Sequence, residues 1–135
     1  MVIFSQTSVG LSAAAVHRRL KRLRDSGVII AEVAIVDPDS VGLSVTCVVT
    51  VDVDREGLQE LERFNARMRA CPQVQQCWYV TGEADYVLVV VVEDMAAYEA
   101  FTREELLADP NVRSFTTHVV LSPVKRGLQL PIAER

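Results

Sequence analysis

The chain has few of the residues on which catalysis, metal binding and disulfide frameworks depend. Its three cysteines, Cys47, Cys71 and Cys77, form no C-x-x-C pair and have no histidine beside them, which argues against a zinc site or a disulfide framework. Only His17 and His118 supply imidazoles, and the sequence has no G-x-S-x-G, no H-E-x-x-H and no glycine-rich phosphate loop. We therefore expect no enzyme, no metal and no cofactor, and cysteines that act as small apolar residues.

Long apolar runs are also missing. The longest, residues 87–92, is far shorter than the ~18 residues that a membrane-spanning helix needs, and the amino terminus lacks the pattern of a secretory signal. Yet half of the 135 residues are apolar, which argues against a disordered chain and is enough for about one domain, or one small domain with an appendage. These features predict a cytoplasmic protein that does not enter membranes.

Charge is distributed unevenly along the chain. Residues 1–36 carry five basic and two acidic side chains, a net charge of +3, whereas residues 37–135 carry nine basic and sixteen acidic side chains, a net charge of -7. A basic segment joined to an acidic body predicts one anion-binding surface, with nucleic acid as the first candidate. The alternative interpretation is an ordinary solvated helix face.

The pattern of residues 11–25 is that of an amphipathic helix. Val16, Leu20 and Leu23 recur at helical spacing, Ser12 suits the N-cap position, and Gly27 suits a carboxyl-terminal stop. The remaining surface is cationic and includes His17, Arg18, Lys21, Arg22 and Arg24.

Residues 28–36, which are mostly β-branched and aliphatic, predict a strand directly after this helix. The Asp37-Pro38-Asp39 sequence then predicts a turn. We place the domain boundary here, with residues 1–36 as a partial helix-turn-helix segment and residues 42–135 as a second domain.

In the second domain the apolar pattern alternates between strand and helix periods. The predicted elements are a strand at 45–53, a helix at 55–70, strands at 74–81 and 85–92, a helix that starts after an Asp94 N-cap, and a strand at 112–121. Met95, Tyr98 and Phe101 are expected to face inward from the second helix. The order β-α-β-β-α-β predicts an α+β domain of the ferredoxin-like type.

The strand at 85–92 predicts an additional contact. Residues 87–92 are apolar on both faces of the strand, whereas a sheet with helices on one side alone needs alternation. Because two helices cannot cover both sides, we expect the open face to pack against a second copy in a homodimer.

Several motifs carry a family resemblance. Residues 10–29 hold G-L-S, V-x-R-R, R-L and G-V-I in register, and this segment resembles the recognition helix of the Lrp/AsnC family of bacterial and archaeal transcription regulators. Residues 34–38 with Val41-Gly42 resemble the linking strand of that family, residues 80–86 its effector-loop signature, and Val124-Lys125 with Leu130-Pro131 its carboxyl-terminal segment.

The resemblance implies a regulator that binds duplex DNA, responds to an amino acid or related metabolite, and forms dimers that assemble further, often into octamers. The residues it assigns to DNA contact are Ser12, Ala14, Ala15, His17, Arg18, Arg19, Lys21 and Arg22. The effector loop is Thr81, Gly82, Glu83, Ala84 and Asp85, which can offer backbone N–H groups to a carboxylate and acidic groups to an ammonium. Thr116 and His118 lie on a polar face of the last strand that either lines the effector pocket or is solvated.

The amino-terminal segment departs from the family pattern. Family members usually carry two helices before the recognition helix, and residues 1–9 are too short to supply both. The alternative function is therefore an effector-binding and oligomerisation module that does not bind DNA by itself.

Overall fold

The computed structural model describes residues 12–133, which fall into two compact units. One unit is Asp37–Val124, and the other holds the chain up to Val36 together with the residues from Lys125 onward. The division falls after Val36, and the predicted domain boundary was placed between residues 36 and 42. The carboxyl-terminal segment, however, groups with the first unit, whereas the sequence analysis assigned it to the second. No helix within residues 12–133 has the length and apolar character to cross a membrane.

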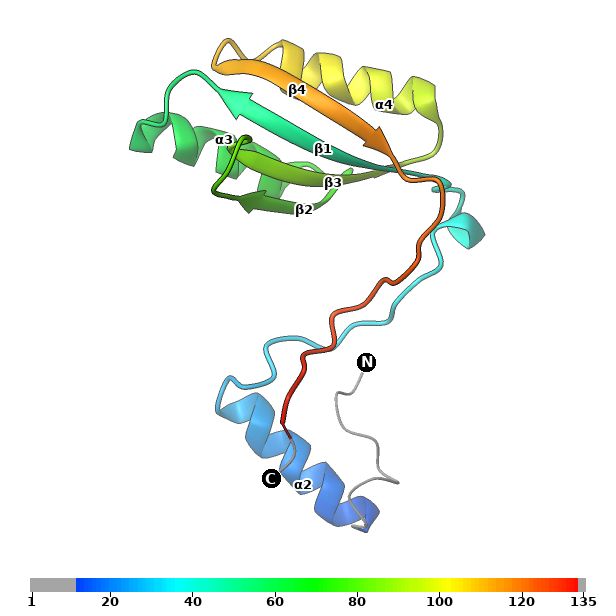
Figure 1. Cartoon of the computed structure of the whole chain (residues 1–135). Helices are drawn as coiled ribbons and strands as arrows, with labels where there is room; N and C mark the ends of the chain where they lie inside the picture. The colour runs from blue at the N-terminus through cyan, green and yellow to red at the C-terminus, as the bar shows by residue number, and fades with distance from the viewer. Residues whose placement is uncertain (1–11, 134–135) are drawn as a thin grey trace. The chain divides into compact units, whose positions relative to one another are not determined.

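The first unit is built around helix α2 (Ala13–Asp25), the predicted amphipathic helix (Figure 1). Its start is capped by Ser12, whose Oγ accepts a hydrogen bond from the Ala15 N–H at 3.1 Å. Val16 is buried on the apolar stripe. The helix ends at Asp25, and Gly27, which follows the C-cap Ser26, adopts the left-handed backbone conformation with φ 82° that a residue with a Cβ rarely takes.

The strand predicted at residues 28–36 is wrong. This segment joins no sheet among residues 12–133, and Val28, Ile30 and Ile35 expose more than half of their side-chain surface. A β-branched composition favours an extended backbone, but a strand also needs a neighbouring strand to satisfy its backbone groups, and no local pattern reveals whether that neighbour exists.

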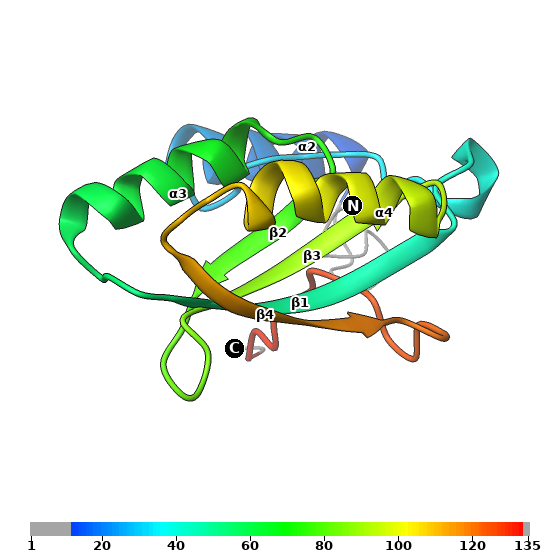
Figure 2. The ribbon, with the colours of Figure 1, turned by 90° about the horizontal axis from the view of Figure 1, so that it is seen from above.

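The second unit has the predicted ferredoxin-like architecture. Its elements are the 3-10 turn η1 (Asp39–Val41), β1 (Val45–Val53), α3 (Leu58–Ala70), β2 (Val74–Tyr79), β3 (Tyr86–Val92), α4 (Met95–Phe101), the π-helix η2 (Thr102–Leu107) and β4 (Val112–Val119). The strands form one antiparallel sheet in the order β2-β3-β1-β4, and α3 and α4 cover the same face of it (Figures 1 and 2).

The core lies between this sheet and the two helices. Alternate residues of the central strands are fully buried, including Cys47, Val49 and Leu88, and they pack against Phe64 and Phe101 of the helices. Each such side chain contributes about 1.5–3 kcal/mol by leaving water. Cys47 and Cys71 are buried, Cys77 is half-buried, and all three are free thiols in the structure.

One residue predicted to face the core is exposed instead. Met95 is 47% exposed, because a step of three residues turns a helix by about 300°, and so Met95 lies at the edge of the stripe that holds Tyr98 and Phe101. The last strand, predicted to reach residue 121, is also shorter than expected, and Leu121 is 98% exposed. Strand β4 ends at Val119 because its partner β1 begins at Val45. The last hydrogen bond between the two strands runs from the Val120 N–H to the Thr46 carbonyl.

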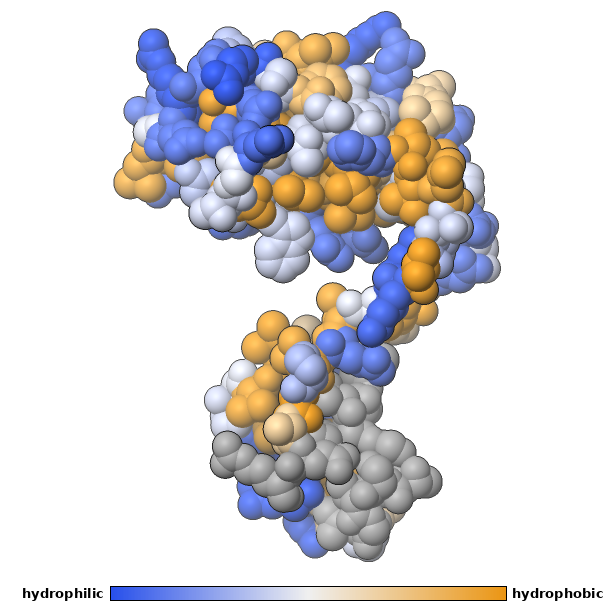
Figure 3. Space-filling model, viewed as in Figure 1, coloured by the Kyte–Doolittle hydropathy of each residue, from blue (hydrophilic) through white to orange (hydrophobic). Residues whose placement is uncertain are grey.

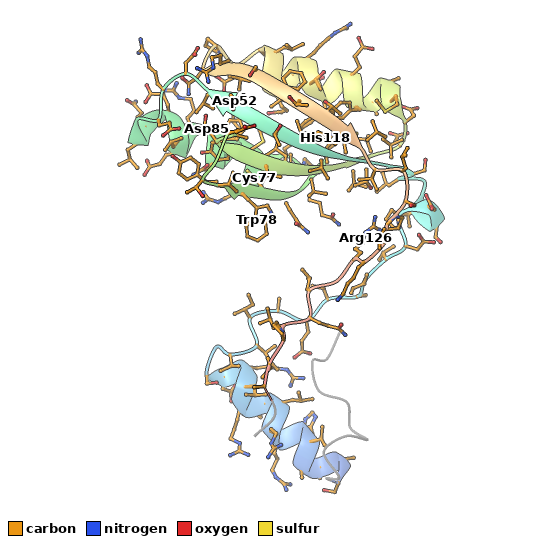
Figure 4. The ribbon with its side chains drawn as sticks, in the orientation of Figure 1. Asp52, Cys77, Trp78, Asp85, His118 and Arg126 are labelled. Atoms are coloured by element: carbon orange, nitrogen blue, oxygen red, sulfur yellow. The ribbon has the colours of Figure 1, made fainter. Side chains whose placement is uncertain are left out.

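Neither α3 nor α4 covers the other face of the sheet (Figure 2), and we call it the open face. Strand register places two rows on it: Gln76, Val89, Val48 and His118, and next to them Trp78, Val87, Thr50 and Thr116. Trp78 is 57% exposed and points away from the helices (Figure 4). Apolar residues also reach the surface of this unit in the space-filling view (Figure 3). The two-sided apolar character of β3 therefore corresponds to a partly uncovered sheet surface.

Candidate nucleic-acid and effector sites

Helix α2 presents a cationic surface. Every residue assigned to DNA contact is exposed except Ala15, which is half-buried. Ser12 already uses its hydroxyl to cap the helix. Within the described part of the chain no ion pair involves Arg18, Arg19 or Arg22. These three guanidinium groups are therefore free to bind phosphate oxygens.

Two other basic residues of α2 have acidic partners. Lys21 Nζ lies 3.2 Å from Asp25 Oδ2, one turn along the helix. Arg24 forms a bidentate pair with Glu32, which raises the pKa of Arg24 and lowers that of Glu32 through their hydrogen bond. Arg24 therefore ties the linker to the helix, and the cationic surface centres on Arg18, Arg19 and Arg22.

The predicted effector loop is the connection between β2 and β3. The Val80 N–H bonds to the Asp85 carbonyl at 2.9 Å, and the Asp85 N–H bonds to the Val51 carbonyl at 3.0 Å, so that both ends of the loop are fixed to the sheet. Gly82 has φ 115°, which is outside the usual range of residues with a Cβ. Thr81, Gly82 and Glu83 are exposed between these anchors. The loop therefore presents backbone N–H groups and one exposed carboxylate.

Asp85 is the centre of a small polar cluster. Its Oδ2 accepts a hydrogen bond from the Val53 N–H at 2.8 Å, and Tyr79 donates its hydroxyl to Glu56 Oε2 at 3.3 Å. Hydrogen bonding between Glu56 and Asp85 raises the pKa of Glu56 and lowers the pKa of Asp85, which the Val53 N–H lowers further. The loop thus ends at a pair of carboxyl groups. As the pH rises, Asp85 loses its proton first and Glu56 loses its proton at a higher pH.

This carboxylate pair predicts a pH-dependent effect of Glu56→Gln. A raised pKa in the folded state means that Glu56 stabilises the fold below its ordinary pKa of about 4.3 and loses this contribution as the pH rises. Glutamine is uncharged at every pH, so we expect Glu56→Gln to raise Tm at pH 7, with the difference disappearing toward pH 4. Thermal unfolding by circular dichroism measures this, with the exposed Glu62→Gln of α3 as the control. A lower Tm of Glu56→Gln at pH 7 would contradict the interpretation.

Thr116 and His118 lie apart from the loop within one chain. Both are exposed on the open face, where Thr116 pairs with Thr50 and His118 with Val48. Asp85 bonds to the backbone of Val51 and Val53, on either side of Asp52 in β1. Asp52 pairs with Ser114 of β4, and His118 lies four residues, or roughly 13 Å, further along that strand. Figure 4 shows this separation between Asp85 and His118.

Glu56 and Tyr79 were missed by the sequence analysis. They are 29 and 6 residues from Asp85, on the connection before α3 and at the end of β2. No local motif links them. They come together through strand pairing. Tyr79 of β2 lies opposite Tyr86 of β3, and β1 pairs with β3 and ends at the same end of the sheet, shortly before Glu56.

Two family models match the sequence. The model described as the Lrp/AsnC ligand binding domain matches residues 46–130, which cover every strand and helix of the ferredoxin-like unit after η1. The model described as a winged helix-turn-helix DNA-binding domain matches residues 6–30, which include α2. The two matches correspond to the effector loop and the cationic helix, respectively.

Individual relatives agree with these matches. An HTH-type transcriptional regulator of Sinorhizobium fredii is 44% identical over 92% of this chain and 73% of its own length. The leucine-responsive regulatory protein of Salmonella typhimurium is 34% identical over 94% of this chain and 77% of its own. A transcriptional regulator of Neisseria meningitidis, solved in complex with L-methionine, superposes with a TM-score of 0.83 and 34% identity over 91% of this chain and 79% of its own. The chain belongs to the Lrp/AsnC family of DNA-binding transcription regulators.

Proposed function

We propose that α2 of this chain contacts duplex DNA and that its ferredoxin-like unit dimerises and binds an amino acid. The observation that carries the proposal is a set of three exposed arginines on α2, Arg18, Arg19 and Arg22, which form no ion pair with residues 12–133. They lie in a segment that matches a DNA-binding helix-turn-helix. A protein that contacts DNA in this way acts in the cytoplasm. Its proposed role is to bind DNA and an effector, and it involves no catalysis.

Cationic side chains and small residues have different roles in this contact. Arg18, Arg19, Lys21, Arg22 and His17 suit phosphate oxygens, which fix the position of the helix on the duplex without reading sequence. The small side chains of Ser12, Ala14 and Ala15 at the helix start allow a close approach of the backbone to base edges.

The open face supports dimerisation. Its rows place Val48, Val87 and Val89 next to one another, and these side chains are only partly covered in the single chain. A two-fold contact through this face would bury the same residues of both copies. Thr116 and His118 would then lie at or beside the contact, where residues of another subunit bring them to an effector. Assembly beyond the dimer, such as an octamer, would place the effector loops at further contacts.

The effector loop fits the polar groups of a free amino acid. Backbone N–H groups around Gly82 suit the α-carboxylate, and the exposed Glu83 suits the ammonium. The Neisseria meningitidis relative, solved with L-methionine, supports this ligand class. The effector can regulate only by binding unequally to two assembly states, and this difference would change how two α2 helices are spaced on DNA.

Isothermal titration with L-methionine and L-leucine tests the effector site. We expect binding to the wild-type protein and affinity about tenfold weaker for Glu83→Gln, because a charged hydrogen bond to the ammonium contributes about 1.5–3 kcal/mol. The matched control is Glu93→Gln, an exposed carboxylate at the end of β3. Equal affinities of the two variants would place the ammonium away from the loop.

A further inference from the structure

A cavity lies between α3 and the edge strand β2, and residues 81–85 of the predicted effector loop do not line it. Its volume is about 440 Å³, within the usual range of small-molecule sites. Asn65, Met68 and Arg69 line it from the helix, and Gln76 and Cys77 line it from the strand. The rings of Tyr79 and Tyr86, whose centroids are 5.1 Å apart, close one end.

The strand is shaped irregularly at this place. The pairing of β2 with β3 shifts register between Val74 and Gln76, which is a β-bulge. A bulge changes the direction in which neighbouring side chains point, and bulges are common beside binding sites. Here it lies at the wall of the cavity, because Val74, Gln75 and Gln76 all line it.

The polar groups of the cavity are mainly hydrogen-bond donors. The Asn65 Oδ1 already accepts the Tyr86 hydroxyl at 2.7 Å, so the Asn65 NH₂ group remains for a ligand. The Gln76 side chain instead bonds the Trp78 indole N–H at 3.2 Å on the open face. Arg69 adds a guanidinium, close enough to Cys77 to act on the thiol electrostatically.

No acidic residue lines the cavity, although acidic residues outnumber basic ones in the chain. An anion therefore finds donors and one positive charge, whereas an ammonium finds no carboxylate partner. Met68, Val74 and the tyrosine rings supply apolar surface for a hydrocarbon portion. We propose that this cavity binds a small carboxylate with an aliphatic body and no ammonium group, with Arg69 as its charge partner.

This inference does not rest on the proposed effector loop, and a single set of probes separates the two sites. The probes are 4-methylpentanoate, 4-methyl-2-oxopentanoate and leucine, which share one carbon skeleton and differ at the α-carbon. In ¹H–¹⁵N spectra of the full chain, we expect the first two to shift the side-chain NH₂ signal of Asn65 and the backbone N–H signals of Arg69 and Cys77, which line the cavity. We expect leucine to leave these signals in place.

Arg69→Gln keeps the size and polarity of the side chain at an exposed helix position, so the fold should be retained. We expect it to weaken binding of 4-methylpentanoate at least about tenfold, because one charge-assisted pair is lost. Arg63→Gln, on the same helix and outside the cavity, should bind as the wild type does.

Three results would overturn the proposal: shifts confined to the Gly82 loop, equal titrations of Arg69→Gln and Arg63→Gln, or absence of saturation at millimolar 4-methylpentanoate. Binding of leucine at the cavity as tightly as 4-methylpentanoate would overturn the assigned ligand class.

Discussion

Replacing Val89 by Asp is expected to convert the protein to a monomer. Val89 lies on the open face, next to Val48 in its row, and is partly exposed in the single chain, so an aspartate there reaches water once the copies separate. In a two-fold dimer the substitution places two carboxylates in one contact. Burial of such charges without partners costs at least ~4 kcal/mol, which corresponds to a dimer Kd raised about 1,000-fold.

Sedimentation velocity measures the change directly, and the single tryptophan gives a second readout. Trp78 lies opposite Val87 on the open face and is 57% exposed, so its emission should shift to longer wavelength when the partner leaves. The control is Leu58→Asp, which changes an apolar residue that is 73% exposed at the first position of α3, away from the open face. A wild-type monomer at micromolar concentration, or a Val89→Asp protein that remains dimeric, would contradict dimerisation through this face.

The double substitution Arg18→Gln with Arg22→Gln is expected to weaken DNA binding about 10- to 100-fold at physiological salt. Loss of two phosphate contacts should also reduce the slope of log K against log[salt] by about two, because each contact releases about 0.9 of a counterion. The two arginines are four residues apart and therefore lie on one side of α2, where both are exposed.

A control with the same change of charge separates contact from general electrostatics. Arg55→Gln with Arg63→Gln removes two exposed cations from the ferredoxin-like unit and should leave the salt slope unchanged. If both double variants lose affinity equally, then α2 does not contact the duplex, and the effector-binding module becomes the better description of the chain.

Local periodicity was sufficient to predict most of the fold. The alternation of Val45, Cys47, Val49, Val51 and Val53 is the buried face of β1, and the two-sided apolar pattern of residues 87–92 predicted a sheet surface that no helix covers. The same kind of pattern failed at residues 28–36, which form no strand in the structure although they are mostly apolar and β-branched. Composition determines the tendency to extend, whereas pairing depends on distant residues.

The sites were predictable only where they are continuous in sequence. The cationic residues of α2 and the loop at Gly82 each occupy one short segment, so the helical spacing and the family resemblance were enough to propose them. Glu56 and Tyr79 come together with Asp85 through strand pairing, and the Arg69 cavity needs the packing of α3 beside β2. Such arrangements follow from topology, which a periodic pattern does not determine in detail.

Fluorescence anisotropy of the wild-type chain tests the central claim most directly. The protein is titrated against duplex DNA from its own promoter and against a scrambled duplex, at two salt concentrations, with and without mixed amino acids. A DNA-binding, amino-acid-responsive regulator predicts tighter binding to the promoter, affinity that falls steeply with salt, and a further change when amino acids are added. Absence of binding to both duplexes at low salt would contradict it.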